Sequence, residues 1–105
     1  SLIYNTTGIG NTAYGMYSIA VNTTGNYNTG VGYQTLYNSY AATNNTAIGA
    51  FAGLNTTTKG NNNSAVGYQS LYKNTTGYSN VAVGMNALYS NTFAEILLRL
   101  VILPS

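Results

Sequence analysis

The strongest constraint on this chain is a short phrase that returns about every 17 residues. Each copy runs from an asparagine to a glycine and has a small residue at its centre. The five closing glycines are Gly15, Gly32, Gly49, Gly67 and Gly84, at successive intervals of 17, 17, 18 and 17 residues. A fixed interval of this length is typical of a solenoid, in which each coil contacts only its neighbours. The sequence therefore predicts a stack of about five similar coils.

Each repeat also predicts β structure. Two short segments rich in β-branched or aromatic residues flank the closing glycine and lead into a polar turn, such as residues 22–25. Asn, Thr and Gly suit such turns because they tolerate positive φ or bond nearby backbone groups. Glycine and asparagine recur too often for a helix, and the apolar residues lack a 3.6-residue spacing. We therefore expect an all-β fold, a parallel β-solenoid with two strands and two turns in each 17-residue coil.

Stacking the coils aligns equivalent residues into rows, because neighbouring parallel strands lie about 4.8 Å apart. One apolar row comprises Val31, Ile48, Val66 and Val83, and another comprises Ile19, Leu36, Leu71 and Leu88. We expect both apolar rows to be buried as the structural core. A third row comprises Asn11, Asn28, Asn45, Asn63 and Asn80. It predicts an amide ladder of the kind that stabilises stacked β structure.

A stack of this width has a thin core. Small domains bury a small share of their surface, so one such chain would be marginally stable by itself. We therefore expect the chain to associate with copies of itself along one face, as a homo-oligomer.

The groups that catalysis requires are scarce in this sequence. Charged residues make up 4% of it, Glu95 is the single acid, and Cys and His are absent. General acid–base catalysis needs titratable groups placed together, and Lys59 and Lys73 lie in or beside polar turns, where we expect them to be solvated. We therefore expect no enzyme, no metal site and no cofactor. The net charge of +2 is also spread too thinly for a nucleic-acid-binding stripe.

Tyrosine is the residue most suited to binding here, because it offers a broad ring face and a polar tip. Of the 11 tyrosines, Tyr37, Tyr72 and Tyr89 recur at one position of the repeat and form a possible contact surface for a sugar or a protein. The alternative is that these three side chains pack at a subunit interface. The repeated Thr-Thr turns raise ice binding as another hypothesis, although the glycine after most of these pairs favours a turn over a flat face.

Phrases such as residues 45–49 and 63–67, of the form Asn-Thr/Ser-Ala-Ile/Val-Gly, resemble the head repeats of trimeric autotransporter adhesins, the YadA-like head. Similar arrays occur in phage and virus-like tail-fibre proteins. The resemblance extends from about Leu2 to Phe93, although this repeat is a few residues longer than the usual head repeat and richer in tyrosine. It implies a left-handed parallel β-roll in which three chains pack side by side as a homotrimer. In that family the apolar rows face the axis shared by the three chains, so by that resemblance the row of Val31, Ile48, Val66 and Val83 faces the interior.

The repeat pattern ends before the C-terminus. Residues 1–93 form the predicted β-roll repeat domain, which we expect to be a fragment of a longer array because residues 2–8 match only the tail of a coil. Residues 94–105 are strongly apolar around Arg99 and are too few to span a bilayer. We expect them to cap the stack, to contact another subunit or to begin a following segment.

These observations together predict a non-enzymatic structural or adhesive segment of a longer surface or fibre protein. Repeated Asn, Thr and Tyr side chains on three identical chains would give avidity without a deep pocket. The expected partners are copies of the chain itself and a host surface protein or glycan, with no nucleic acid and no membrane insertion by this segment. The expected location is the cell surface, the extracellular space or a virion fibre. The alternatives are a self-contained carbohydrate-binding or ice-binding β-solenoid and a passive spacer without a ligand.

Overall fold

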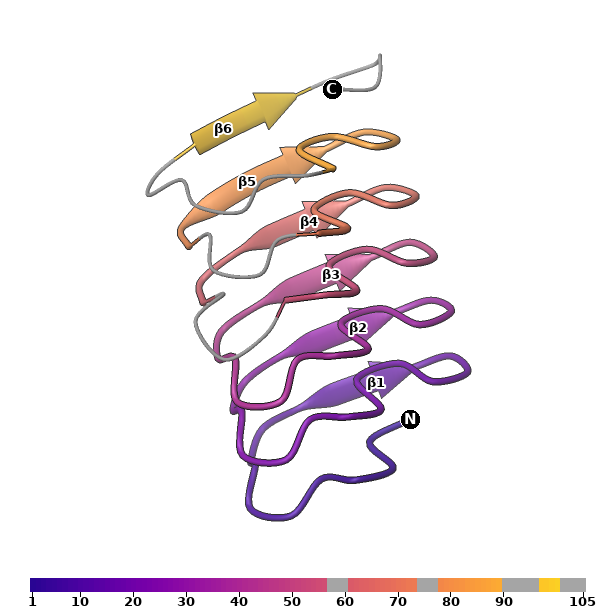
Figure 1. Ribbon diagram of the computed structural model, residues 1–105, viewed down its shortest axis with the longest axis vertical. Helices are drawn as coiled ribbons and strands as arrows, with labels where there is room; N and C mark the ends of the chain where they lie inside the picture. Colours follow the sequence, from indigo (N-terminus) through magenta and orange to yellow (C-terminus); the bar gives the residue numbers. More distant parts are fainter. Residues whose placement is uncertain (57–60, 74–77, 90–96, 101–105) are drawn as a thin grey trace.

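The computed structural model of the chain is a parallel β-solenoid (Figure 1). The structure describes residues 1–56, 61–73 and 78–89 and the backbone of residues 97–100. Its strands are β1 (Thr12–Tyr14), β2 (Thr29–Val31), β3 (Thr46–Ile48), β4 (Ser64–Val66), β5 (Asn80–Val83) and β6 (Leu97–Leu100). They form one sheet in which the order along the sequence is also the order in space. The prediction of an all-β solenoid is therefore confirmed.

The strands pair in the register that the repeat predicts. β2 lies between β1 and β3 as a parallel neighbour of both, with Thr29 opposite Thr12 and Thr46. The 18-residue interval is absorbed outside the strands, because Thr46 of β3 still pairs with Ser64 of β4. β6 continues the sheet beside β5, and the rest of the segment 94–105, with its predicted cap or subunit contact, lies outside the described residues. One repeat is therefore one coil, and rows of equivalent residues run along the stack.

The second strand predicted for each coil is absent from the described residues, and that prediction is wrong. In its place, the backbone adopts positive φ at the second and fourth residues after each closing glycine. After Gly15, for example, φ is 58° at Tyr17 and 50° at Ile19. An extended strand requires negative φ throughout. These segments still form a ladder between coils, because the Ile19 N–H donates to the Thr35 carbonyl oxygen at 2.8 Å.

The interior of the coils is narrow and is filled by small and medium side chains. On the strand side, it is lined by the central residue of each strand, including Ala47, Ala65 and Ala82. The predicted core row of Ile19, Leu36, Leu71 and Leu88 packs in the same cluster, and no member is more than 7% exposed. These two rows therefore form the hydrophobic core. In the coil after Gly49, the buried Gly53 stands at the position that Ile or Leu occupies in the other coils.

The other predicted apolar row does not lie inside the coil, and that prediction is wrong. The row consists of Val31, Ile48, Val66 and Val83. Ile48 is 41% exposed and Val66 is 39% exposed. Successive side chains of a strand point to opposite faces, so the small residue before each Val or Ile points inward and the larger one points out. The interior has no room for a Val or Ile side chain at the inward position. Even a Cβ on Gly30 would lie 2.6 Å from the hydroxyl oxygens of Ser18 and Thr35.

The predicted asparagine ladder lies inside the stack, beside the start of each strand. Asn28 donates its backbone N–H to the Oδ1 atom of Asn11 at 2.9 Å, and Asn45 donates to Asn28 at 3.0 Å. The same bond recurs from Asn63 to Asn45 and from Asn80 to Asn63. All members except the half-buried Asn11 are buried. The ladder therefore satisfies backbone and side-chain groups that water does not reach.

Candidate functional site

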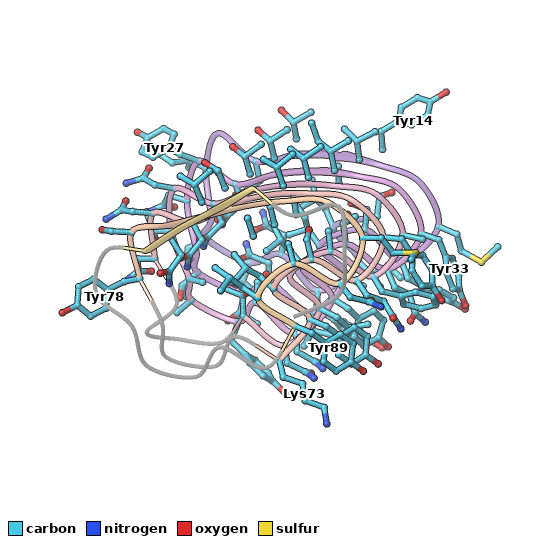
Figure 2. All side chains as sticks on the ribbon, turned by 90° about the horizontal axis from the view of Figure 1, so that it is seen from above. Tyr14, Tyr27, Tyr33, Lys73, Tyr78 and Tyr89 are labelled. Carbon is cyan, nitrogen blue, oxygen red and sulfur yellow. The ribbon has the colours of Figure 1, made fainter. Side chains whose placement is uncertain are left out.

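The exterior of the solenoid presents rows of side chains on separate sides (Figure 2). We call the outward side of β1–β5 the strand face; its apolar row is Tyr14, Val31, Ile48, Val66 and Val83. We call the cluster of rings after the closing glycines the aromatic face; it consists of Tyr17, Tyr33, Tyr37, Phe51, Tyr68, Tyr72 and Tyr89. Viewed down the stack, Tyr14 lies apart from Tyr33 and Tyr89, while Tyr27 and Tyr78 lie toward the other end of the coil.

The strand face combines a hydroxyl row with the apolar row. Thr12, Thr29, Thr46 and Ser64 occupy the first position of their strands, two residues before the apolar row, and pair in register. Both positions point away from the core, and Tyr14 is 75% exposed. None of these side chains carries a charge. Exposed apolar patches of this kind mark contact surfaces, so the strand face suits packing against another apolar surface.

The aromatic face is a chain of touching rings. Phe51 contacts Tyr33 and Tyr68 edge-on, at centroid distances of 5.3 and 5.8 Å. It also contacts Tyr72 at 6.3 Å, and Tyr72 stacks on Tyr89 at 4.9 Å. Aromatic pairs of this kind contribute about 0.5–1.5 kcal/mol beyond their buried area. The rings are therefore held in a fixed arrangement along the outside of the stack.

The structure brings together two of the three predicted contact tyrosines. Tyr72 lies against Tyr89, whereas Tyr37 lies against Tyr17, and all three predicted residues are half-buried. Sequence reasoning did not single out Tyr33 and Tyr68, which stand directly after closing glycines and are more exposed than these three residues. Tyr33 and Tyr68 could have been found from the sequence, because tyrosine recurs directly after a closing glycine, where the chain leaves the strand.

The described Thr-Thr turns are bonded into the stack. The Thr23 carbonyl oxygen accepts the N–H groups of Thr6, Thr7 and Gly8. The Thr6 hydroxyl also donates to this carbonyl oxygen, at 2.9 Å. At this turn, the Thr6 hydroxyl therefore does not belong to an open flat array, which is the arrangement that the ice-binding hypothesis requires.

The part of the chain that the structure describes holds few groups suited to chemistry. Within it, no three His, Cys, Asp or Glu side chains lie together as a metal site would require. Lys73 places its Nζ atom 5.8 Å from the centroid of the Tyr89 ring, within cation–π range. Lys59 and Glu95 lie outside the described residues. No helix in residues 1–56, 61–73 or 78–89 is long and apolar enough to cross a membrane.

No protein-family model, no curated protein and no solved structure matches this chain significantly. In the part of the chain that the structure describes, the strand face and the aromatic face both carry regular, closely spaced side chains.

Proposed function

We propose that this chain is a non-enzymatic structural or adhesive segment of a surface or fibre protein, and that it works as a homotrimeric left-handed β-roll. The observation that carries the proposal is the exposed apolar row of the strand face. In the proposed trimer, three strand faces pack around a shared axis. This arrangement is the one implied by the resemblance to the YadA-like heads of trimeric autotransporter adhesins and to tail-fibre arrays.

Covering the strand face is favourable because its Val and Ile side chains have no room inside the coil. Ile48, Val66 and Val83 each expose between 37% and 41% of their surface. Burying the exposed part of such a side chain contributes on the order of 1 kcal/mol. Parallel sheets are ordinarily covered on both faces, and here the coil interior covers one of them. Copies of the same chain supply a matching row, and cyclic symmetry closes the assembly.

The aromatic face supplies the adhesive surface in this proposal. It lies on a different side of the coil from Tyr14, so packing through the strand faces leaves it open (Figure 2). Its repetition along the stack and across three chains allows many weak contacts to add up to avidity. The proposed partner is a host surface protein or glycan, and the proposed location is the cell surface, the extracellular space or a virion fibre.

Light scattering coupled to size-exclusion chromatography tests the trimer. We expect a mass near three times the 11.1 kDa of the single chain. A single-chain mass over the whole accessible concentration range would overturn the trimer, and with it the role assigned to the strand face.

Carbohydrate binding by a single chain is a second candidate, and the continuity of the aromatic face favours it. The apolar face of a sugar ring stacks on an aromatic ring, and Tyr33 is 42% exposed for such a contact. A glycan array identifies any ligand, and calorimetric titration of Tyr33→Ala then tests the site. The matched control is Tyr78→Ala, which changes an exposed tyrosine toward the other end of the coil. Binding lost in the first variant and kept in the second supports this candidate; equal binding in both argues against it.

A further inference from the structure

We propose that Tyr72 and Tyr89 form an oxidative cross-linking site, at which a one-electron oxidant joins the two phenol rings as dityrosine. The two residues are 17 positions apart and occupy the same place in successive coils. Their ring centroids lie 4.9 Å apart, and the ring planes are within 3° of parallel. Among the described aromatic contacts, this pair alone is stacked, since the others are inclined by 62° to 81°.

The reaction joins two rings through carbon atoms. Each phenol loses one electron and its hydroxyl proton, which gives a tyrosyl radical with spin density on the ring carbons next to the C–O carbon. Two such carbons form a carbon–carbon bond, and the hydrogen on each joined carbon then moves to oxygen, which restores both phenols. The two electrons and two protons released reduce one hydrogen peroxide to two waters in the reaction of a peroxidase, the oxidant class that we propose.

Parallel stacking is the geometry that favours this coupling. With nearly parallel planes and centroids 4.9 Å apart, the Tyr72 and Tyr89 rings face each other, so the carbons that carry spin in one radical lie close to the ring of the other. In an edge-on pair, such as Tyr17 with Tyr37 at 6.1 Å and 73°, the edge of one ring faces the other at a steep angle. Phe51 separates Tyr33 from Tyr68 and has no phenol to oxidise.

The backbone holds the pair at this distance. The Lys73 N–H donates to the Tyr89 carbonyl oxygen at 2.8 Å, and the Leu71 N–H donates to the Ala87 carbonyl oxygen at 2.9 Å. These bonds join the two coils directly beside the rings. Tyr89 lies on the aromatic face, away from Tyr14 (Figure 2), and Tyr72 stacks against it. Both residues are half-buried, so part of each remains accessible to an oxidant. A bond here would staple neighbouring coils and reduce the conformational freedom of the unfolded chain.

Treating the full chain with a peroxidase and hydrogen peroxide tests the site. We expect blue dityrosine fluorescence, a mass loss of two hydrogens per chain, and a cross-linked peptide that contains Tyr72 and Tyr89. Under denaturing electrophoresis, the product should migrate as one chain, because the bond lies within it.

Matched variants identify the tyrosines responsible. Tyr72→Phe and Tyr89→Phe keep the ring and its packing but remove a phenol, so each should lose most of the fluorescence. Tyr33→Phe, on the same face, should keep it. Undiminished fluorescence in Tyr72→Phe, or a cross-linked peptide that joins other tyrosines or two chains, would overturn the assignment.

Discussion

The spacing between coils limits which residue fits at particular positions of this protein. Because coils stack about 4.8 Å apart, the backbone of one coil lies directly against the next. At Gly49, φ is 117°, and a Cβ there would lie 2.8 Å from the carbonyl carbon of Gly67. Ile19 shows the opposite case, since this β-branched residue is held at a φ of 50° with its side chain fully buried. Strain of this kind persists only where the surrounding packing compensates for it.

Replacing Gly49 with alanine should lower the free energy of unfolding by about 1–3 kcal/mol, because the added Cβ meets backbone atoms and its φ is unfavourable for an L-residue. Equilibrium urea denaturation measures this change. The control is Thr24→Ala in an exposed turn, which should change stability by less than about 0.5 kcal/mol. A Gly49→Ala protein as stable as the parent would show that the corner relaxes without loss.

Asn45→Ala should also lower the free energy of unfolding by about 1–3 kcal/mol, the range for a buried group left without its partner. The backbone N–H of Asn63 would lose its acceptor, the Oδ1 atom of Asn45 at 2.9 Å. Thr24→Ala, in an exposed turn, is the matched control. The same denaturation experiment serves both variants, and an equal loss in the two would contradict a specific role for the ladder.

At the scale of elements, each coil joins one short strand to a segment of alternating left-handed residues. Both parts bond to the next coil, and both contain β-branched or aromatic residues, so the sequence pattern alone predicted two strands. The difference lies in the backbone, because positive φ at positions such as Gln34 and Leu36 winds the chain tightly. This winding narrows the interior and leaves the central strand position with room for Ala or Gly only.

Two side-chain truncations in one coil compare an inward-pointing residue with an outward-pointing one. Leu71→Ala removes a side chain that is 1% exposed and should lower the free energy of unfolding by about 2–5 kcal/mol through the cavity that it leaves. Val66→Ala, at 39% exposure, should lower it by less than about 1 kcal/mol in the dissociated chain. Denaturation at concentrations where light scattering detects single chains gives both values. A larger loss for Val66→Ala would mean that its row is buried after all.

At the scale of the whole molecule, the thin coil leaves apolar side chains outside. The chain carries four charged residues in 105, so solubility depends on Asn, Thr, Ser and Tyr. An apolar row on the outer side of the sheet is either exposed to water or in contact with another surface. The homotrimer that we propose supplies the contact, and it leaves the aromatic face free for a partner.

Ile48→Asp should convert the proposed trimer to single chains. The substitution places three carboxylates around the proposed axis, where burying unpaired charge is unfavourable. The fold of one chain should persist, because Ile48 is 41% exposed and the effect of a strand substitution spans about 1 kcal/mol. Light scattering measures the mass and circular dichroism checks the fold, with Thr24→Asp in the exposed turn as control. A folded Ile48→Asp trimer would place the interface elsewhere.

Part of the fold and of the candidate site was predictable because coils that stack in register turn sequence spacing into spatial contact. The 17-residue interval predicts that Thr29 pairs with Thr46, and that Asn28 bonds to Asn45. It also places Tyr72 beside Tyr89. The interval contains no information on ring orientation. The stacked geometry of Tyr72 and Tyr89 depends on the path of the backbone after each closing glycine.

The sequence by itself determined the solenoid, its register, the asparagine ladder and the row of Ile19, Leu36, Leu71 and Leu88. The tertiary structure decided which side of each strand faces the core. Both Ala47 and Ile48 are apolar, so the pattern of residues allowed either to be buried. Only the narrow interior, set by the left-handed residues that follow each glycine, restricts the inward position to the smaller side chain.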